Sequence, residues 1–157
     1  SGVVGQVRTL EPGVRQEVAD VWGVAADFRW KMTRCFGLMG EVFTGQALGT
    51  YNGGILQTTN TVTFEGIRTT GGWLEGFMYW TPCLHSHVGY AIDDPVDRDV
   101  LATGRVYNST VYGNVLWDIS QAFRVGFEVT WRQTNYQSLI LPDKEAAGFH
   151  TQFQWAF

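Results

Sequence analysis

The chain has 157 residues, enough for one domain with a core of its own. Its net charge of -4 and its 11 scattered Lys and Arg residues leave no broad basic stripe, so we expect no nucleic-acid partner. The combination of 15% aromatic residues and 19 glycines with only 17% charged residues is unusual for a soluble domain and suits a β-sheet that faces something apolar.

Apolar and polar residues alternate along much of the chain, which is the signature of a strand with two different faces. Over 17–32, Trp22 and Trp30 fall on one face and Asp27 on the other. The pattern predicts seven strands, near 17–32, 36–49, 68–81, 84–93, 105–117, 123–132 and 145–157. No helix of more than a turn or two is predicted, and no apolar run approaches the roughly 20 residues that a transmembrane helix needs.

The predicted connections alternate strictly in length. Short turns lie near residues 34, 82 and 120, and long polar loops span 50–66, 93–104 and 135–144. Up-and-down barrels of the outer membrane have short turns on the periplasmic side and longer loops outside. We therefore predict an all-β fold, an antiparallel up-and-down transmembrane β-barrel with about seven or eight strands in this chain.

The strand count leaves two arrangements open. With the C-terminus on the short-turn side, seven strands place Glu17 on the long-loop side, whereas bacterial barrels have an even strand number and both ends in the periplasm. Residues 1–14 are then the end of an upstream strand plus a loop, and 1–157 is the C-terminal portion of a larger barrel. The alternative is a single complete eight-stranded barrel domain whose first strand is short.

Several segments resemble the strands of a known family. The closing segment EAAGFHTQFQWAF places aromatic residues at alternate positions and ends on Phe157, and it resembles the last strand of bacterial outer-membrane barrels. Together with GEVFTGQALGTYNGGI, IRTTGGWLEGFMYW, VGYAIDDP, TVYGNVLWDIS and FRVGFEVTWRQTNY, it resembles the last seven strands of large porin-like proteins. The resemblance implies a barrel of about 16 strands, usually trimeric, that passes small hydrophilic solutes. The chain departs from that family by being far shorter.

A porin-like channel predicts a different role for each face. Polar residues on the inner face set the local field and tune which solutes pass, although the same residues could be only a wall of paired charges that keeps the lumen wet. We assign to the lumen Asp27, Arg29, Lys31, Glu41, Glu75, Arg124, Glu128, Arg132, His150 and Gln152. Aromatic residues on the outer face form interfacial girdles in such barrels. We assign to the girdle Trp30, Trp80, Trp117, Trp131, Trp155 and Phe157.

Two groups of residues have the chemistry of metal ligands. His85 and His87 share one strand face, but a site needs three or four ligands, with the third from His150 or a carboxylate. The other group lies near the loop 93–104, without the spacing of an EF-hand, and is better interpreted as a solvated acidic loop. It consists of Asp93, Asp94, Asp97 and Asp99. We predict no metal site and no cofactor.

Cys35 and Cys83 lie in different short turns on one predicted rim. A disulfide is permitted in an oxidising periplasm, and the distance between the turns leaves the pairing open. No G-x-S-x-G motif occurs and no Ser-His-Asp triad can be assembled, so we expect no enzymatic activity.

The sequence therefore predicts a porin-like channel in the bacterial outer membrane. Its partners are the lipid bilayer, small solutes, and further copies or an upstream barrel segment. Two alternatives remain: a soluble lipocalin-like barrel that binds an apolar ligand, and a structural or assembly subunit. The strands of such a subunit would complete a barrel or fibre with other chains, because unpaired sheet edges need partners.

Overall fold

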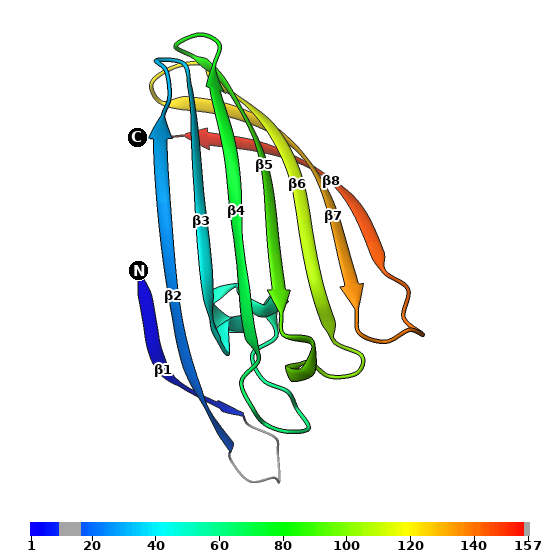
Figure 1. The fold of residues 1–157 in the computed structure, drawn as a ribbon. Helices are drawn as coiled ribbons and strands as arrows, with labels where there is room; N and C mark the ends of the chain where they lie inside the picture. The colour runs from blue at the N-terminus through cyan, green and yellow to red at the C-terminus, as the bar shows by residue number, and fades with distance from the viewer. Residues whose placement is uncertain (10–16, 156–157) are drawn as a thin grey trace.

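Eight strands form one antiparallel sheet in the computed structural model, which describes residues 1–9 and 17–155 (Figure 1). The strands follow one another in chain order across the sheet, so the topology is an up-and-down meander. They are β1 (Gly2–Thr9), β2 (Glu17–Lys31), β3 (Phe36–Gln46), β4 (Arg68–Tyr79), β5 (Leu84–Pro95), β6 (Arg105–Asp118), β7 (Phe123–Tyr136) and β8 (Lys144–Trp155). The predicted all-β, antiparallel, up-and-down fold is confirmed.

The strand boundaries lie close to those predicted. β3 ends at Gln46 rather than Gly49, because Ala47 takes a left-handed backbone conformation with φ of 57° and the chain turns into a 3-10 helix. Residues 2–9, in the segment predicted to be the end of a strand plus a loop, form the strand β1, which pairs with residues 17–24 of β2. The predicted loop after this segment lies mostly outside the described residues.

Each short connection is closed by a hydroxyl side chain at the same point of the turn. Thr33 Oγ1 accepts hydrogen bonds from the backbone N–H groups two and three residues later, at 3.2 and 2.9 Å. Thr81 Oγ1 does the same at 3.3 and 3.0 Å, and Ser120 Oγ at 3.3 and 3.1 Å. Such side-chain turns satisfy backbone groups that a tight connection leaves unpaired. Short connections at 32–35, 80–83 and 119–122 therefore alternate with long ones, as predicted.

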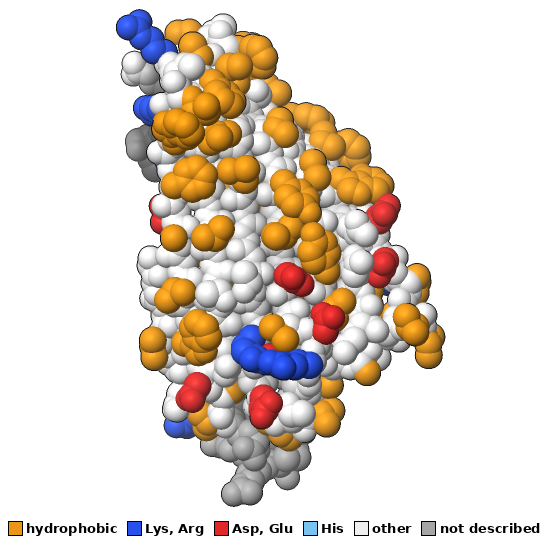
Figure 2. Space-filling view, viewed as in Figure 1, with side chains coloured by type: hydrophobic (Ala, Val, Ile, Leu, Met, Phe, Trp, Pro, Cys, Tyr) orange, Lys and Arg blue, Asp and Glu red, His pale blue; other side chains and the backbone are white. Residues whose placement is uncertain are grey.

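The register places the polar and apolar sets on opposite faces of the sheet. Asp27 lies opposite Glu41 and Glu128 lies opposite His150, so their side chains share one face, here called the inner wall. The sheet curls so that β8 passes behind β3 to β5, and the face toward the viewer is the convex one (Figure 1). Figure 2 shows this outer face, on which apolar side chains spread over the upper part and charged side chains gather toward the long connections.

The buried core lies between the inner wall and the connection that joins β3 to β4. This inserted connection, residues 47–67, contains two 3-10 helices, η1 (Leu48–Tyr51) and η2 (Gly54–Leu56), and one isolated bridge between Thr59 and Gly66. Leu48 and Ala47 pack on Val21 of β2. Burying a leucine side chain such as Leu48 contributes roughly 1.5–3 kcal/mol. The connection therefore folds into the concave side of the curled sheet, here called the trough, and does not extend away from its rim.

The eight described strands do not close into a barrel. β1 pairs only with β2, β8 pairs only with β7, and no pairing joins β1 to β8 among the described residues. The sheet is therefore open in the described residues, with one edge of β8 and one edge of β1 unpaired. A third helix, η3 (Asp97–Asp99), is as short as the other two. No helix in the described part of the chain is long and apolar enough to cross a membrane.

Candidate functional site

The inner wall brings together all of the residues that were assigned to the lumen. They come from five strands, and the register places every one of them on the same face of the sheet, namely Asp27, Arg29 and Lys31 of β2, Glu41 of β3, Glu75 of β4, Arg124, Glu128 and Arg132 of β7, and His150 and Gln152 of β8. They differ in burial: Arg132, for example, is exposed, whereas Glu75 is buried. A water-filled lumen predicts that all of these side chains are solvated, but in the structure part of the wall is buried.

The outer face carries the aromatic residues that were assigned to the girdle. Trp30, Trp80 and Trp117 are 59%, 63% and 55% exposed, and Trp131 and Trp155 are 50% and 67% exposed. Trp80 donates a hydrogen bond from Nε1 to Ser86 Oγ at 2.9 Å, which fixes the ring on the outer surface beside a short turn. Phe157 lies outside the described residues. The aromatic rings thus stand on the outer surface with half or more of their area exposed.

A chain of polar contacts crosses the inner wall from β4 to β6. Glu75 Oε1 lies 2.5 Å from His87 Nδ1, and His87 Nε2 lies 2.9 Å from His85 Nδ1. The other nitrogen of His85, Nε2, lies 3.6 Å from Asp118 Oδ2. Arg124 then donates from Nε to Asp118 Oδ1 at 2.5 Å. We call the linked side chains Glu75, His87, His85 and Asp118 the histidine relay.

The histidine relay is covered by aromatic rings. The His85 ring stacks on Tyr79 with centroids 5.0 Å apart, and the Phe77 ring lies beside His87 with centroids 6.2 Å apart. Phe77 is itself covered by the Arg29 guanidinium, which lies 5.0 Å above its ring. As a result the Glu75 and His85 side chains are only 9% and 6% exposed.

A glycine lets a tyrosine reach the buried carboxylate across one strand. Glu75, Gly89 and Tyr112 lie side by side in the register of β4, β5 and β6, and Tyr112 donates its hydroxyl proton to Glu75 Oε2 at 2.7 Å. A Cβ atom at Gly89 would lie 2.3 Å from the Tyr112 ring, which is closer than real side chains approach. The absence of a side chain at Gly89 therefore permits the contact.

A smaller polar group lies beside the relay toward β8. His150 Nδ1 lies 3.5 Å from Glu128 Oε1, and Asn114 Nδ2 donates to Glu128 Oε2 at 3.4 Å. The amide oxygen of Asn114 is buried and has no hydrogen-bond partner. These groups line a cavity of about 150 Å³ together with Gln152. These side chains therefore present hydrogen-bond donors and acceptors to the cavity.

Asp93 fixes the inserted connection on the inner wall. Its carboxylate accepts hydrogen bonds from the backbone N–H groups of Gly54 at 3.2 Å and Ile55 at 2.7 Å, and from the Thr69 hydroxyl at 2.6 Å. Gln57 adds a second attachment, because its side-chain amide donates to the Arg105 carbonyl at 2.7 Å. Both attachments hold the middle of the connection over β4 to β6.

Asp99 fixes the far end of the same connection from the outside. Its carboxylate accepts hydrogen bonds from Arg68 Nε at 2.7 Å and Nη2 at 2.8 Å, while its backbone carbonyl accepts one from the Asn60 side chain at 3.1 Å. The hydrogen bond from Arg68 lowers the pKa of Asp99 below its usual value. A carboxyl group with a lowered pKa stabilises the folded state above the unfolded pKa of about 3.9, and this contribution is lost as pH falls through the folded pKa.

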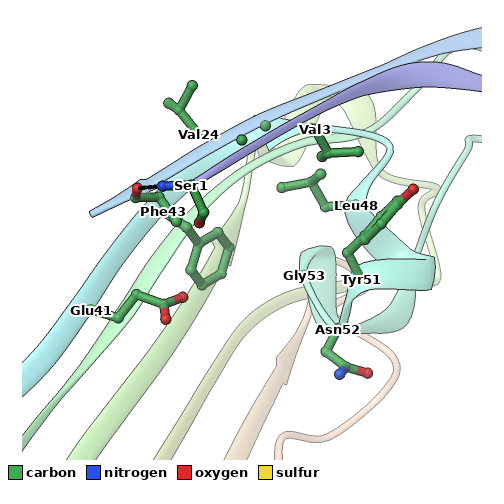
Figure 3. Close-up of a pocket in the computed structure, with 12 residues that line it drawn as sticks. Ser1, Val3, Val24, Glu41, Phe43, Leu48, Tyr51, Asn52 and Gly53 are labelled. Atoms are coloured by element: carbon green, nitrogen blue, oxygen red, sulfur yellow. Dashed lines mark hydrogen bonds between the residues drawn. The ribbon is translucent and has the colours of Figure 1, made fainter. Parts of the chain in front are cut away.

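A cavity of about 590 Å³ lies where the inserted connection meets β2 and β3 (Figure 3). Its lining includes the apolar side chains of Phe43 and Leu48 and the polar side chains of Glu41 and Asn52, which lie on opposite sides of it. Ser1 donates a hydrogen bond from its nitrogen to the Ala25 carbonyl at 2.9 Å beside it, at the point where β1 stops covering β2. The cavity is thus bounded by an open sheet edge.

The structure also places the residues with metal-ligand chemistry. No group of three or more His, Cys, Asp or Glu side chains within the described ranges is arranged to hold a metal ion. Asp94 and Asp97 are exposed, as a solvated loop predicts, but Asp93 and Asp99 are occupied by the contacts above. The two cysteines, which are exposed in separate short turns, are free thiols.

Three members of the inner wall were not singled out from the sequence. Asp118 is the last residue of β6 and does not lie in a turn. Tyr112 binds Glu75 through its hydroxyl and Tyr79 stacks on His85, contacts that an aromatic residue in a strand does not by itself indicate. One signal was present, because Tyr112 stands on the predicted polar face of its strand.

Comparison of the chain with protein-family models, curated proteins and solved structures gives no match.

Proposed function

We propose that the chain forms part of a porin-like channel in the bacterial outer membrane, through which small hydrophilic solutes pass passively. The observation that supports this most is the segregation of the two faces of one curled sheet. The concave inner wall carries ion pairs and hydrogen-bonded polar groups, whereas the convex face carries exposed apolar side chains on every one of the longer strands. A barrel in lipid has this distribution of apolar-out and polar-in residues.

The exposed apolar side chains favour lipid over water on the outer face. Val42, Leu74 and Val88 are 64%, 51% and 64% exposed, and Phe149 and Phe153 are 71% and 70% exposed. Soluble monomers rarely expose contiguous apolar patches of more than a few hundred Å². A surface that continues from β2 to β8 is therefore explained more simply by contact with acyl chains.

The same distribution argues against a lipocalin-like protein. A soluble barrel that binds an apolar ligand requires an apolar interior and a polar exterior, which is the reverse of the arrangement around Glu75, Glu128 and Phe127. The inserted connection does bring apolar residues into the trough, but Leu48 and Ala47 are already packed against Val21. Leu48 also lines the cavity of about 590 Å³ together with Phe43, but that cavity is confined to the connection and the first three strands, and the inner wall over the remaining strands carries polar side chains such as Glu75 and Glu128.

The unpaired edges favour an assembly of strands beyond the eight described. Backbone N–H and C=O groups cannot remain unpaired in the hydrocarbon region, so β1 and β8 need neighbouring strands. β1 and β8 run in opposite directions, and a further even number of antiparallel strands would join them into a closed barrel. Those strands come from an upstream barrel segment or from further copies, and trimers of the completed barrel are compatible with either source. A purely structural assembly subunit is the second candidate, supported by the same edges.

Conductance of single channels in a planar lipid bilayer tests the proposal. Protein inserted into the bilayer should give stepwise currents, and Arg132→Glu, which reverses an exposed charge on the inner wall, should shift the permeability ratio toward cations. Arg8→Glu is the matched control, because Arg8 is exposed on the outer face of β1. Folded protein that is inserted as a closed barrel and carries no current would overturn the channel and leave the assembly role.

A further inference from the structure

The contacts of the histidine relay limit how many protons its two imidazole rings can hold. It contains two hydrogen bonds, from His87 Nδ1 to Glu75 at 2.5 Å and between His87 Nε2 and His85 Nδ1 at 2.9 Å, and one longer link from His85 Nε2 to Asp118 at 3.6 Å, which is an ion pair when His85 is protonated. Each hydrogen bond needs one proton between its two atoms, and the longer link is attractive only with a proton on His85 Nε2. Carboxylates supply none when ionised, so the two imidazoles must supply all three.

Counting protons distinguishes the charge states of the pair. Two neutral imidazoles carry two N–H groups, which leaves one link with two facing acceptors. One additional proton gives three N–H groups, so that every link has one donor and one acceptor. A second additional proton gives four, and the two rings then present N–H groups to each other across the 2.9 Å contact between His85 and His87. The singly protonated pair is the state that supplies a donor to both hydrogen bonds and also makes the contact between His85 and Asp118 attractive.

The charges around the pair favour the same state. Glu75 and Asp118 are negative, Arg124 is positive and paired with Asp118, and one proton on the histidine pair makes the group neutral overall. Burial makes an unbalanced charge expensive, and the Glu75 and His85 side chains are 9% and 6% exposed. The other titratable or charged groups that face the relay are Tyr79 from β4, Tyr112 from β6, Glu128 from β7 beyond Asn114, and Arg29 from β2 beyond Phe77.

We propose that the His85–His87 pair shares one additional proton in the resting protein and acts as a pH-sensitive joint between β4, β5 and β6. Acidification adds the second proton, the contact between the rings becomes repulsive, and the pair separates. Separation uncouples Glu75 from Asp118 and leaves a positive charge on the inner wall. The proton inventory follows from the contacts alone, whereas any effect of the separated pair on solute passage rests on the proposed channel.

Nuclear magnetic resonance of protein labelled with ¹⁵N-histidine, folded in detergent micelles, tests the proton inventory. The chain has only three histidines, so His150 serves as the internal reference. At neutral pH the relay histidines should show three imidazole N–H groups. On acidification they should titrate in two steps more than about 1 pH unit apart, because coupled sites lose and gain protons as a unit. Two N–H groups at neutral pH, or one common step coinciding with that of His150, would overturn the proposal.

A matched pair of variants tests whether the additional proton depends on the Glu75 carboxylate and not on another carboxylate of the inner wall. Glu75→Gln removes the carboxylate that the shared proton needs, so the relay should drop to two imidazole N–H groups at neutral pH. Glu128→Gln removes the carboxylate beside His150 and should leave the relay signals unchanged. Equal relay signals in both variants would contradict the proposal. Because the measurement needs only folded protein, a chain that binds its proton as described but carries no current would refute the channel and leave the joint intact.

Discussion

Placing an arginine at Phe127 tests directly which face of the sheet meets lipid. Phe127 lies on the outer face of β7, is 50% exposed, and stands midway between Phe123 at the short turn and Trp131. At about 3.4 Å per residue, the strand from Phe123 to Trp131 spans about 27 Å. With a strand tilt of about 35–45° this corresponds to about 20 Å along the membrane normal, which places Phe127 near the bilayer midplane.

An arginine at the midplane of a barrel's lipid face costs about 2–4 kcal/mol. Phe127→Arg should therefore lower the free energy of unfolding by that amount, which is about a 30-fold to 900-fold change in the equilibrium constant. The control is Gln152→Arg, because Gln152 is exposed on the inner wall and adjoins Thr151, the cross-strand partner of Phe127. A change at an exposed polar position should stay within about 0.5 kcal/mol.

Urea unfolding of the protein in phosphatidylcholine vesicles, followed by the fluorescence of its 7 tryptophans, measures both variants. The expected result is a loss of stability for Phe127→Arg alone. Costs that agree within about 0.5 kcal/mol, or a larger cost for Gln152→Arg, would refute the assignment of the two faces.

Three further predictions follow from the contacts. Asp93→Ala leaves the donors that hold the inserted connection unpaired, at about 1–3 kcal/mol each, so limited proteolysis should cut within 47–67 faster than in the unmodified protein. Asp99→Asn should flatten the loss of stability as pH falls below about 4 in unfolding measurements, because the lowered pKa of Asp99 supplies stability that acid removes. Gly89→Ala should cost about 1–3 kcal/mol by displacing the Tyr112 ring, whereas Gly113→Ala, whose new Cβ would meet nothing nearer than 3.8 Å, should change stability by less.

Each of these predictions has a result that would contradict it. Unchanged cleavage in Asp93→Ala would mean that the connection is held by its apolar contacts alone. An acid limb in Asp99→Asn as steep as in the unmodified protein would assign the pH dependence to other carboxylates. Equal costs for Gly89→Ala and Gly113→Ala would show that the Tyr112 ring moves aside without loss.

The strands could be predicted because alternation is a local property of the sequence. β5 and β7 begin at the predicted residues, Leu84 and Phe123, since each follows a short turn closed by a hydroxyl side chain. β1 falls in the segment 1–14 that the sequence assigns to the end of a strand plus a loop, whereas its bounds and its pairing with β2 come from the structure. The face of each lumen residue followed from the same alternation, because a strand places successive side chains on opposite sides.

The position of the inserted connection and the burial of the relay could not be predicted in the same way. The polar composition of 50–66 indicates a loop but carries no information on whether that loop extends outward or folds onto Asp93, which lies about 40 residues later. The burial of Glu75 depends on the Tyr112 ring lying across Gly89, and that of His85 on the Tyr79 ring, both contacts between neighbouring strands. Such contacts depend on register, which the pattern of a single strand does not contain.

Accessibility of single spin labels along β7 in vesicles tests the central claim most directly. Cys35 and Cys83 are replaced by Ser, and one cysteine at a time is introduced and labelled at Val125, Phe127 and Val129 on the outer face and at Arg124, Glu128 and Arg132 on the inner wall. The outer positions should be relaxed by oxygen dissolved in the lipid, and the inner positions by a water-soluble nickel complex, in strict alternation along the strand. Equal access of the nickel complex to both sets would contradict a sheet that separates lipid from a water-filled interior.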